Sequence, residues 1–242
     1  PRCTRLPDFP EGVSGQFVRL GNGELLAVRD NTTIVSQDDG VSWSERGPVY
    51  AGPKPGISSF LHVLVQTQDG TTVLVYMDLS TAKWGWDDDT GKAAANAQLD
   101  VWSVRSTDGG HTWRDRHMIM QGYCGALITM IQLSSGEIVV PVMNLLRDPD
   151  RQSVLSYVSE DDGVSWSHGN VIDLGGHGHH DGAAEPTLAE LGDGSVLMLI
   201  RTNLDYLWEA RSLDKGLYWR IIQPTKIDAS SAPASIRRLA SG

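Results

Sequence analysis

The chain has 242 residues, of which 40% are hydrophobic and 21% are charged, a composition typical of a globular protein rather than a disordered one. The formal net charge of -10 argues against nucleic acid or an anionic membrane surface as a partner, because both require a basic surface. No apolar run is long enough for a membrane-spanning helix, and the two cysteines predict neither a disulfide framework nor a metal site.

Four segments along the chain share one pattern. In each, an apolar run leads to a polar pair that ends in glycine, and a second apolar run rich in β-branched residues follows. This pattern predicts a β-hairpin whose turn glycine tolerates a positive φ. The segments are 15–28, 60–77, 125–143 and 185–202, with Gly23, Gly70, Gly136 and Gly194 at the turns.

A second motif follows each hairpin after one further predicted strand. The motif is Ser-x-Asp-x-Gly-x-(Ser/Thr/Tyr)-Trp, in which the Asp accepts backbone N–H bonds within a tight turn and the Gly supplies a positive φ. We expect its Trp to pack between neighbouring repeats, so that the motif holds the fold together and does no chemistry. The four copies are SQDDGVSW at 36–43, STDGGHTW at 106–113, SEDDGVSW at 159–166 and SLDKGLYW at 212–219.

The repeat therefore contains four strands in about 50 residues, which is typical of a β-propeller. We expect one all-β propeller domain over residues 1–242, and we expect the chain to be an incomplete part of a longer protein. The second repeat is longer because of the loop 80–98, and long loops on propellers are often functional. The predicted blades are 12–50, 56–120, 124–172 and 184–228, with the start of a fifth at 229–242.

The fourth hairpin carries a glutamate at the start of its first strand and an arginine at the end of its second strand. Glu185 and Arg201 each lie eight residues from the turn centre at Asp193, so they should be cross-strand neighbours at the open end of the hairpin. In a propeller that end opens at one mouth of the central channel. The pair is therefore a candidate anion-binding site, and a purely structural ion pair is the alternative.

The same offset in the other hairpins adds polar residues around this mouth. Asp30, Asp78 and Asn144 then lie at or just after the end of the second strand of their hairpins. His62 lies near the start of the first strand of its hairpin. These side chains could ring the opening together with the Glu185–Arg201 pair. Each of them alone would more simply be a solvated loop residue.

The Gly-rich stretch GGHGHHDG at 175–182 directly precedes the fourth hairpin. We expect this loop to lie over the mouth and to present His180 or Asp181 to a ligand. Clustered histidines can bind zinc, but these lack a regular ligand spacing, so no metal is expected.

The four boxes and the hairpin EPTLAELGDGSVLMLIRT resemble the sialidase (neuraminidase) superfamily of BNR, or Asp-box, repeat proteins, over essentially the whole chain. The resemblance implies a six-bladed propeller with its boxes on the face away from the active site. Glu185 matches the glutamate that polarises a tyrosine nucleophile, and Arg201 matches an arginine of the triad that clamps the substrate carboxylate. It also implies a glycoside hydrolase for an acidic glycan, such as an exo-α-sialidase, without a cofactor and often secreted or periplasmic.

The sequence departs from the family pattern in the first repeat. The family has an arginine ten residues before the position of Gly23, where this chain has Val13. The loop that carries the acid/base aspartate is also missing, so Asp30, Asp78 or Asp88 would have to take that role. Another acidic sugar, such as a uronic acid, therefore fits the sequence as well as sialic acid does.

Two further classes of function stay open. A non-catalytic carbohydrate-binding propeller would keep Glu185 and Arg201 for ligand contact, and it would bind a glycan without hydrolysing one. A protein-interaction scaffold would bind no glycan, and it would leave the Glu185–Arg201 pair without a role.

Overall fold

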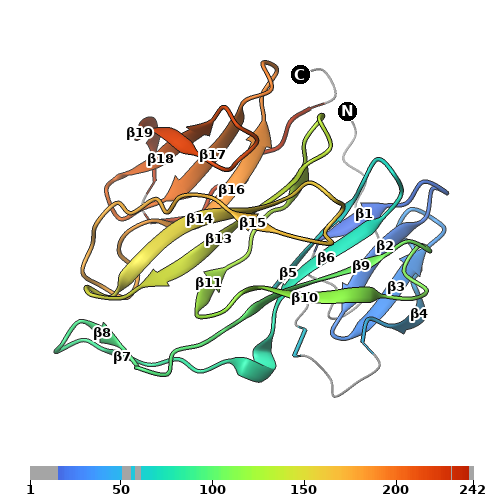
Figure 1. Cartoon of the computed structure of the whole chain (residues 1–242), viewed down its shortest axis with the longest axis horizontal. Coiled ribbons are helices and arrows are strands. Elements are labelled where there is room, and N and C mark those ends of the chain that lie inside the picture. Colours follow the sequence, from blue (N-terminus) through green and yellow to red (C-terminus); the bar gives the residue numbers. More distant parts are fainter. Residues whose placement is uncertain (1–15, 51–55, 58–60, 230, 240–242) are drawn as a thin grey trace.

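The computed structural model describes residues 16–50, 56–57, 61–229 and 231–239, and its regular secondary structure is almost wholly β-strand (Figure 1). The strands form four antiparallel sheets, one after another along the chain, and one small two-stranded hairpin. The helical element in these residues is η1, a 3-10 turn at Leu79–Thr81, and no helix there is long or apolar enough to cross a membrane. The predicted all-β class is confirmed.

Each sheet is built from one repeat of the sequence. The first contains β1 (Phe17–Arg19), β2 (Leu25–Arg29), β3 (Thr32–Ser36) and β4 (Ser44–Pro48), and the second contains β5 (His62–Gln66), β6 (Thr72–Met77), β9 (Val101–Ser106) and β10 (Arg114–Met120). The third contains β11 (Cys124–Ala126), β12 (Ile131–Gln132), β13 (Ile138–Leu146), β14 (Arg151–Ser159) and β15 (Ser167–His168). The fourth contains β16 (Ala184–Glu190), β17 (Val196–Arg201), β18 (Tyr206–Ser212) and β19 (Trp219–Asp228), and the small hairpin pairs β7 (Trp86–Asp87) with β8 (Lys92–Ala93).

The third hairpin differs from its prediction, because its first strand is split into β11 and β12. Between them, Leu127 and Met130 turn into the core that joins the second and third sheets. Gly125 allows the close approach of β13, since a Cβ at that position would lie 2.9 Å from the Met143 sulfur. The packing of Leu127 and Met130 into the core therefore interrupts the pairing of this first strand with β13.

All four sequence boxes form the same closed turn. In the first, the backbone N–H of Gly40 donates to Ser36 Oγ at 2.8 Å, and that of Ser42 donates to Asp38 Oδ1 at 2.8 Å. The Ser42 hydroxyl also donates to Asp38, at 2.6 Å. These donors, with the Ser42 hydroxyl first, lower the pKa of Asp38 to about 2. The carboxylate thus acts as the centre of the turn, which is the structural role that the sequence predicts.

The box tryptophans of the last three repeats connect neighbouring sheets. In each, the indole N–H donates to a hydroxyl on the third strand of the preceding sheet, 63 to 80 residues away. Such bonds satisfy a polar group that would otherwise be buried in the inter-sheet core. The pairs are Trp113 with Thr33 at 2.8 Å, Trp166 with Ser103 at 3.0 Å, and Trp219 with Ser156 at 2.9 Å.

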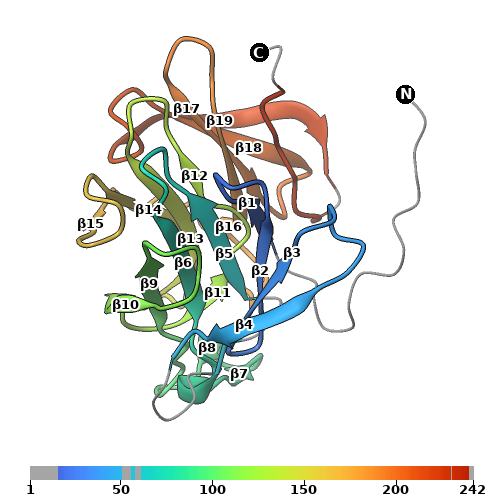
Figure 2. The same cartoon turned by 90° about the vertical axis from the view of Figure 1, so that its right-hand side faces the viewer.

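The main hydrophobic core lies between consecutive sheets. Leu26 packs in one cluster with Leu74, joining the first and second sheets. A second cluster joins the second and third sheets, and Val154 and Met198 belong to the cluster that joins the third and fourth. Within the described part of the chain, the four sheets form an open array that does not close into a ring (Figures 1 and 2).

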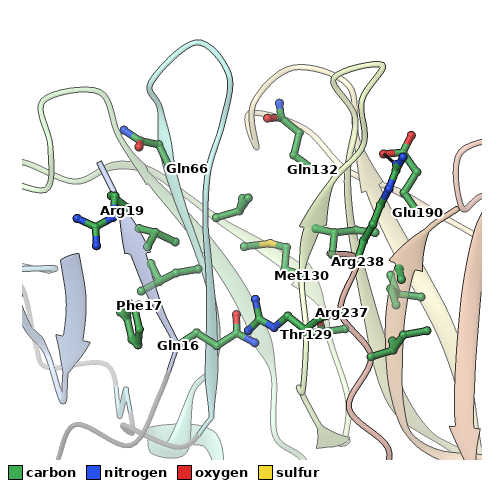
Figure 3. Close-up of a pocket in the computed structure, with 17 residues that line it drawn as sticks. Gln16, Phe17, Arg19, Gln66, Thr129, Met130, Gln132, Glu190, Arg237 and Arg238 are labelled. Atoms are coloured by element: carbon green, nitrogen blue, oxygen red, sulfur yellow. Dashed lines mark ion pairs between the residues drawn. The ribbon is translucent and has the colours of Figure 1, made fainter. Parts of the chain in front are cut away.

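The innermost strands surround a hollow of about 430 Å³ (Figure 3). β1, β5, β12 and β16 contribute lining residues, and so does the C-terminal segment 236–238. There Arg238 Nη1 lies 4.0 Å from Glu190 Oε2 on β16. This hollow runs between the sheets, whereas the acid–arginine pair lies where β16 begins and β17 ends.

Candidate functional site

The predicted acid–arginine pair is present at the end of the fourth sheet. Arg201 Nη1 donates to Glu185 Oε2 at 2.6 Å, and the two side chains are only 18% and 25% exposed. Ala184, not Glu185, lies directly opposite Arg201, and the ladder shifts before Thr187. The register from Thr187 to Glu190, if it continued without the bulge, would place Glu185 itself opposite Arg201. At the bulge Glu185 has a φ of 43°, and its carboxylate still accepts the bond from the Arg201 guanidinium.

The other edge of the Arg201 guanidinium carries a hydroxyl. Ser231 Oγ accepts a bond from Nη2 at 3.0 Å and one from Nε at 3.3 Å. This edge presents two parallel N–H groups, an arrangement that matches the two oxygens of a carboxylate. A single serine oxygen therefore occupies the position in which a carboxylate would bind more strongly. No pattern in the sequence marks Ser231, which lies 30 residues from Arg201.

The Gly- and His-rich loop 175–182 is attached to the turn that follows Arg201. Asn203 Nδ2 donates to Asp181 Oδ1 at 2.9 Å, and the backbone N–H of His177 lies 3.4 Å from the other Asp181 oxygen. Asp181 therefore lies beside the turn that follows Arg201. Its carboxylate holds the loop in place, so a role in ligand contact for Asp181 stays a prediction.

His180 belongs to a group of five aromatic rings that the sequence analysis did not anticipate. We call Trp84, Trp86, Tyr123, His179 and His180 the aromatic platform. The His180 ring centroid lies 4.0 Å from that of His179, which in turn lies 4.9 Å from that of Trp84. Burial first, and then the nearby charge of His180, lower the pKa of His179. The sequence holds only a weak signal for this group, namely two tryptophans in the long loop 80–98 and a His-His pair.

Asp78 and His62 lie on the second sheet. Asp78 is 4% exposed and caps η1: its Oδ1 accepts bonds from the backbone N–H groups of Ser80 and Gly56, both at 2.9 Å. Its Oδ2 accepts a bond from Arg116 Nη2 at 3.1 Å. His62 is 2% exposed and pairs with Tyr76 across the β5–β6 ladder. The polar atoms of Asp78 thus serve to fix the end of β6.

Asp30 and Asn144 lie on the first and third sheets. Asp30 is exposed in the tight turn between β2 and β3, at a φ of 50°. Asn144 lies within β13, and its Nδ2 donates to Ser153 Oγ on β14 at 3.3 Å. Catalytic or substrate-binding roles for Asp30, Asp78, His62 and Asn144 stay predictions.

Comparison with known proteins gives a family for this chain and a set of relatives. The sequence model of one family, described as the BNR repeat-like domain, matches residues 62–242. A sialidase of Paraclostridium sordellii is 25% identical over 247 residues, a match that covers 92% of this chain and 58% of the relative. The chain thus spans less than two thirds of that sialidase.

Solved structures resemble the whole arrangement of sheets. A protein of unknown function from Dyadobacter fermentans matches with a TM-score of 0.65 at 19% identity, over 93% of this chain and 71% of that one. The K499G mutant of the Streptococcus pneumoniae NanB sialidase matches with a TM-score of 0.59 at 13% identity, over 91% and 53%. These likenesses concern the fold, whereas the family match rests on most of the sequence. The chain belongs to the family of BNR repeat-like domains.

Proposed function

We propose that this chain carries part of the active site of a sialidase-like glycoside hydrolase that acts on an acidic glycan. The observation that supports the proposal is the Glu185–Arg201 pair, in which one edge of the guanidinium donates to the Ser231 hydroxyl. The proposal also includes a six-bladed ring of which the four sheets are four blades, with the nucleophile supplied by a further blade.

Arg201 is proposed to bind the carboxylate of the sugar. The incoming carboxylate would displace the Ser231 hydroxyl and accept two parallel N–H bonds from Nε and Nη2. Arg201 Nη1 would keep its bond to Glu185, so the guanidinium stays oriented. The Arg201 side chain is only 18% exposed. Because the surroundings are less polar than water, its attraction for a sugar carboxylate would be stronger there than in water.

Glu185 is proposed to accept a proton from a nucleophilic hydroxyl. As that oxygen attacks the anomeric carbon, the glycosidic bond breaks and an acid donates a proton to the leaving oxygen. A neutral hydroxyl nucleophile suits a sugar that carries a carboxylate beside the reacting carbon, because a carboxylate nucleophile would be repelled. Asp30 suits the acid role better than Asp78, since Asp78 is buried and already bonded to Arg116 and to two backbone N–H groups.

The test is hydrolysis of four fluorogenic glycosides by the full-length protein. The panel contains an α-sialoside, a β-glucuronide, a β-galactoside and an α-L-arabinofuranoside. We expect one of the two acidic glycosides to be cleaved with the highest kcat/KM. Preference for a neutral glycoside would contradict the carboxylate-binding role of Arg201. Binding of an acidic sugar without cleavage would assign the chain to the non-catalytic carbohydrate-binding class.

A further inference from the structure

The loop 175–182 has glycines with positive φ at both of its ends. The φ angles are 81° at Gly175, 108° at Gly176 and 97° at Gly182, values that other residues rarely adopt. The two ends lie against each other, because a Cβ added at Gly176 would be 2.7 Å from the Asp181 Cβ. The residues between these glycines therefore form a small flap whose ends can rotate with little steric hindrance.

The hydrogen bonds between this loop and the sheets are mostly long. Gln152 Nε2 on β14 donates to the His179 carbonyl at 3.4 Å, and the Gly182 N–H donates to Asn203 Oδ1 at 3.5 Å. Gln152 is only 1% exposed, and its Oε1 finds no donor among the residues that the structure describes. A buried amide oxygen without a donor costs free energy, so polar contacts favour the closed position of the loop only weakly.

Ring stacking supplies a further contact between the loop and the rest of the protein. The His179 ring centroid lies 4.9 Å from that of Trp84 and 5.8 Å from that of Trp86, at interplanar angles of 30° and 26°. Trp84 in turn stacks on Tyr123, at 4.1 Å and 27°. His179 thus joins the loop 175–182 to the loop 80–98 of the second sheet.

The loop 80–98 has firmer attachments of its own. Figure 1 shows its β7–β8 hairpin standing out from the body of the four sheets. Arg147 Nη2 donates to the Ala94 carbonyl at 3.0 Å, and Asp150 Oδ2 accepts the Ala93 N–H at 2.8 Å. Two backbone bonds between residues 83 and 98, each 2.8 Å, close the base of the loop. The indoles are therefore a fixed surface against which His179 packs.

Two ionisable groups act on the charge of His179. Burial first, and then the charge of His180, whose ring centroid is 4.0 Å away, lower the pKa of His179, whereas Asp88 on the β7–β8 turn opposes this shift. Burial raises the pKa of Tyr123, so that ring stays neutral in acid. Other charged groups of the packed elements are paired: Arg147 with Asp150, Arg151 with Asp173, Arg201 with Glu185, and Asp181 with Asn203. The remaining ones are exposed to solvent: Lys83, Asp87, Asp89, Lys92, His177 and Asp205.

We propose that the stacking of His179 on Trp84 and Trp86 holds the loop 175–182 closed at neutral pH, and that the loop opens in acid. The closed loop binds a proton less readily than a free histidine, whose pKa is about 6.5, so protonation favours the open loop. The stability of the closed loop is thus complete above about pH 6.5 and falls as the pH drops below it. An imidazolium is attracted to an indole face, but two imidazolium charges this close repel each other more strongly.

Opening of the loop changes the surroundings of the candidate active site. Asp181 bonds to Asn203, two residues after Arg201, and the loop leads directly into β16, which carries Glu185. The effect on a bound glycan rests on the proposed function, whereas the pH-dependent opening itself does not.

The experiment measures amide hydrogen exchange of residues 175–182 in the full-length protein at pH 7.5 and pH 5.0, without any substrate. Each rate is divided by the intrinsic rate at the same pH. We expect the corrected rates to rise at least about fivefold at pH 5.0 in the unmodified protein. In His179→Phe, which keeps a stacking ring but cannot be protonated, we expect them to change less than about twofold.

His168→Phe is the matched control, because His168 also contacts an aromatic ring, that of Tyr157, but lies on β15. It should keep the pH response of the unmodified protein. Equal corrected rates at the two pH values in the unmodified protein would overturn the inference, and this comparison needs no variant. So would an equal rise in His179→Phe, or a rise of the same size in the core strand β13, which would indicate general unfolding in acid. Because no substrate is present, none of these results depends on whether the protein is a hydrolase.

Discussion

Glu185→Gln is expected to lower kcat in the full-length protein by roughly 10²- to 10⁴-fold, the contribution typical of a positioned general base. Glutamine keeps the shape of the side chain and can still accept the bond from Arg201 Nη1, now 2.6 Å long. It cannot take up a proton from a nucleophilic hydroxyl. The loss should therefore fall on kcat, with little change in KM or in melting temperature.

Glu209→Gln is the matched control for this variant. Glu209 lies on β18 of the same sheet, opposite Leu199, and its Oε1 accepts a bond from Gln223 Nε2 at 2.6 Å rather than from Arg201. We expect its kcat to stay within about threefold of the unmodified value, as is usual for a surface substitution. If Glu185→Gln turned over substrate as fast as Glu209→Gln, Glu185 would not be the base.

Gly110→Ala is expected to destabilise the protein by about 3 kcal/mol, because it combines backbone strain with overpacking. Gly110 belongs to the second box and has a φ of 83°, which an alanine rarely adopts. An added Cβ would lie 2.6 Å from Leu26 Cδ1 and 2.9 Å from Thr33 Cγ2, both in the first sheet. The second box would thus be forced away from the sheet that it packs against.

Thermal unfolding of the two alanine variants, Gly110→Ala and Gly21→Ala, measures this effect. Gly21 has no heavy atom within 4 Å of an added Cβ and no strained φ. Its variant should change the free energy of unfolding by less than about 0.5 kcal/mol. Equal melting temperatures for the two variants would show that the boxes do not hold neighbouring sheets together.

The sheets and boxes could be predicted because their signals are local. Alternating apolar runs, turn glycines and the box motif each specify a few adjacent residues, and the structure forms the predicted hairpins and turns from them. The acid–arginine pair was also predicted, since its spacing follows from the hairpin turn. What spacing alone could not give was the bulge, which shifts the pairing by one residue so that Ala184, rather than Glu185, lies opposite Arg201.

The remaining parts of the site depend on contacts between distant segments. Counting along a strand places Asp78 near a strand end, but it does not show that the side chain turns inward to cap η1 and pair with Arg116. In the same way, Ser231 reaches Arg201 and Trp84 meets His179 only after the sheets have packed. No local pattern in the sequence specifies such contacts between distant residues.

The measurement that tests the central claim most directly compares one acidic glycoside with its carboxyl methyl ester, both as substrates of the full-length protein. Esterification removes the charge and one of the two equivalent oxygens that the Nε and Nη2 groups of Arg201 are proposed to bind. We predict that kcat/KM for the ester is at least about 100-fold lower, since hydrogen bonds to charged groups contribute about 1.5–3 kcal/mol. Equal kcat/KM values for acid and ester would contradict the proposal that Arg201 recognises a substrate carboxylate.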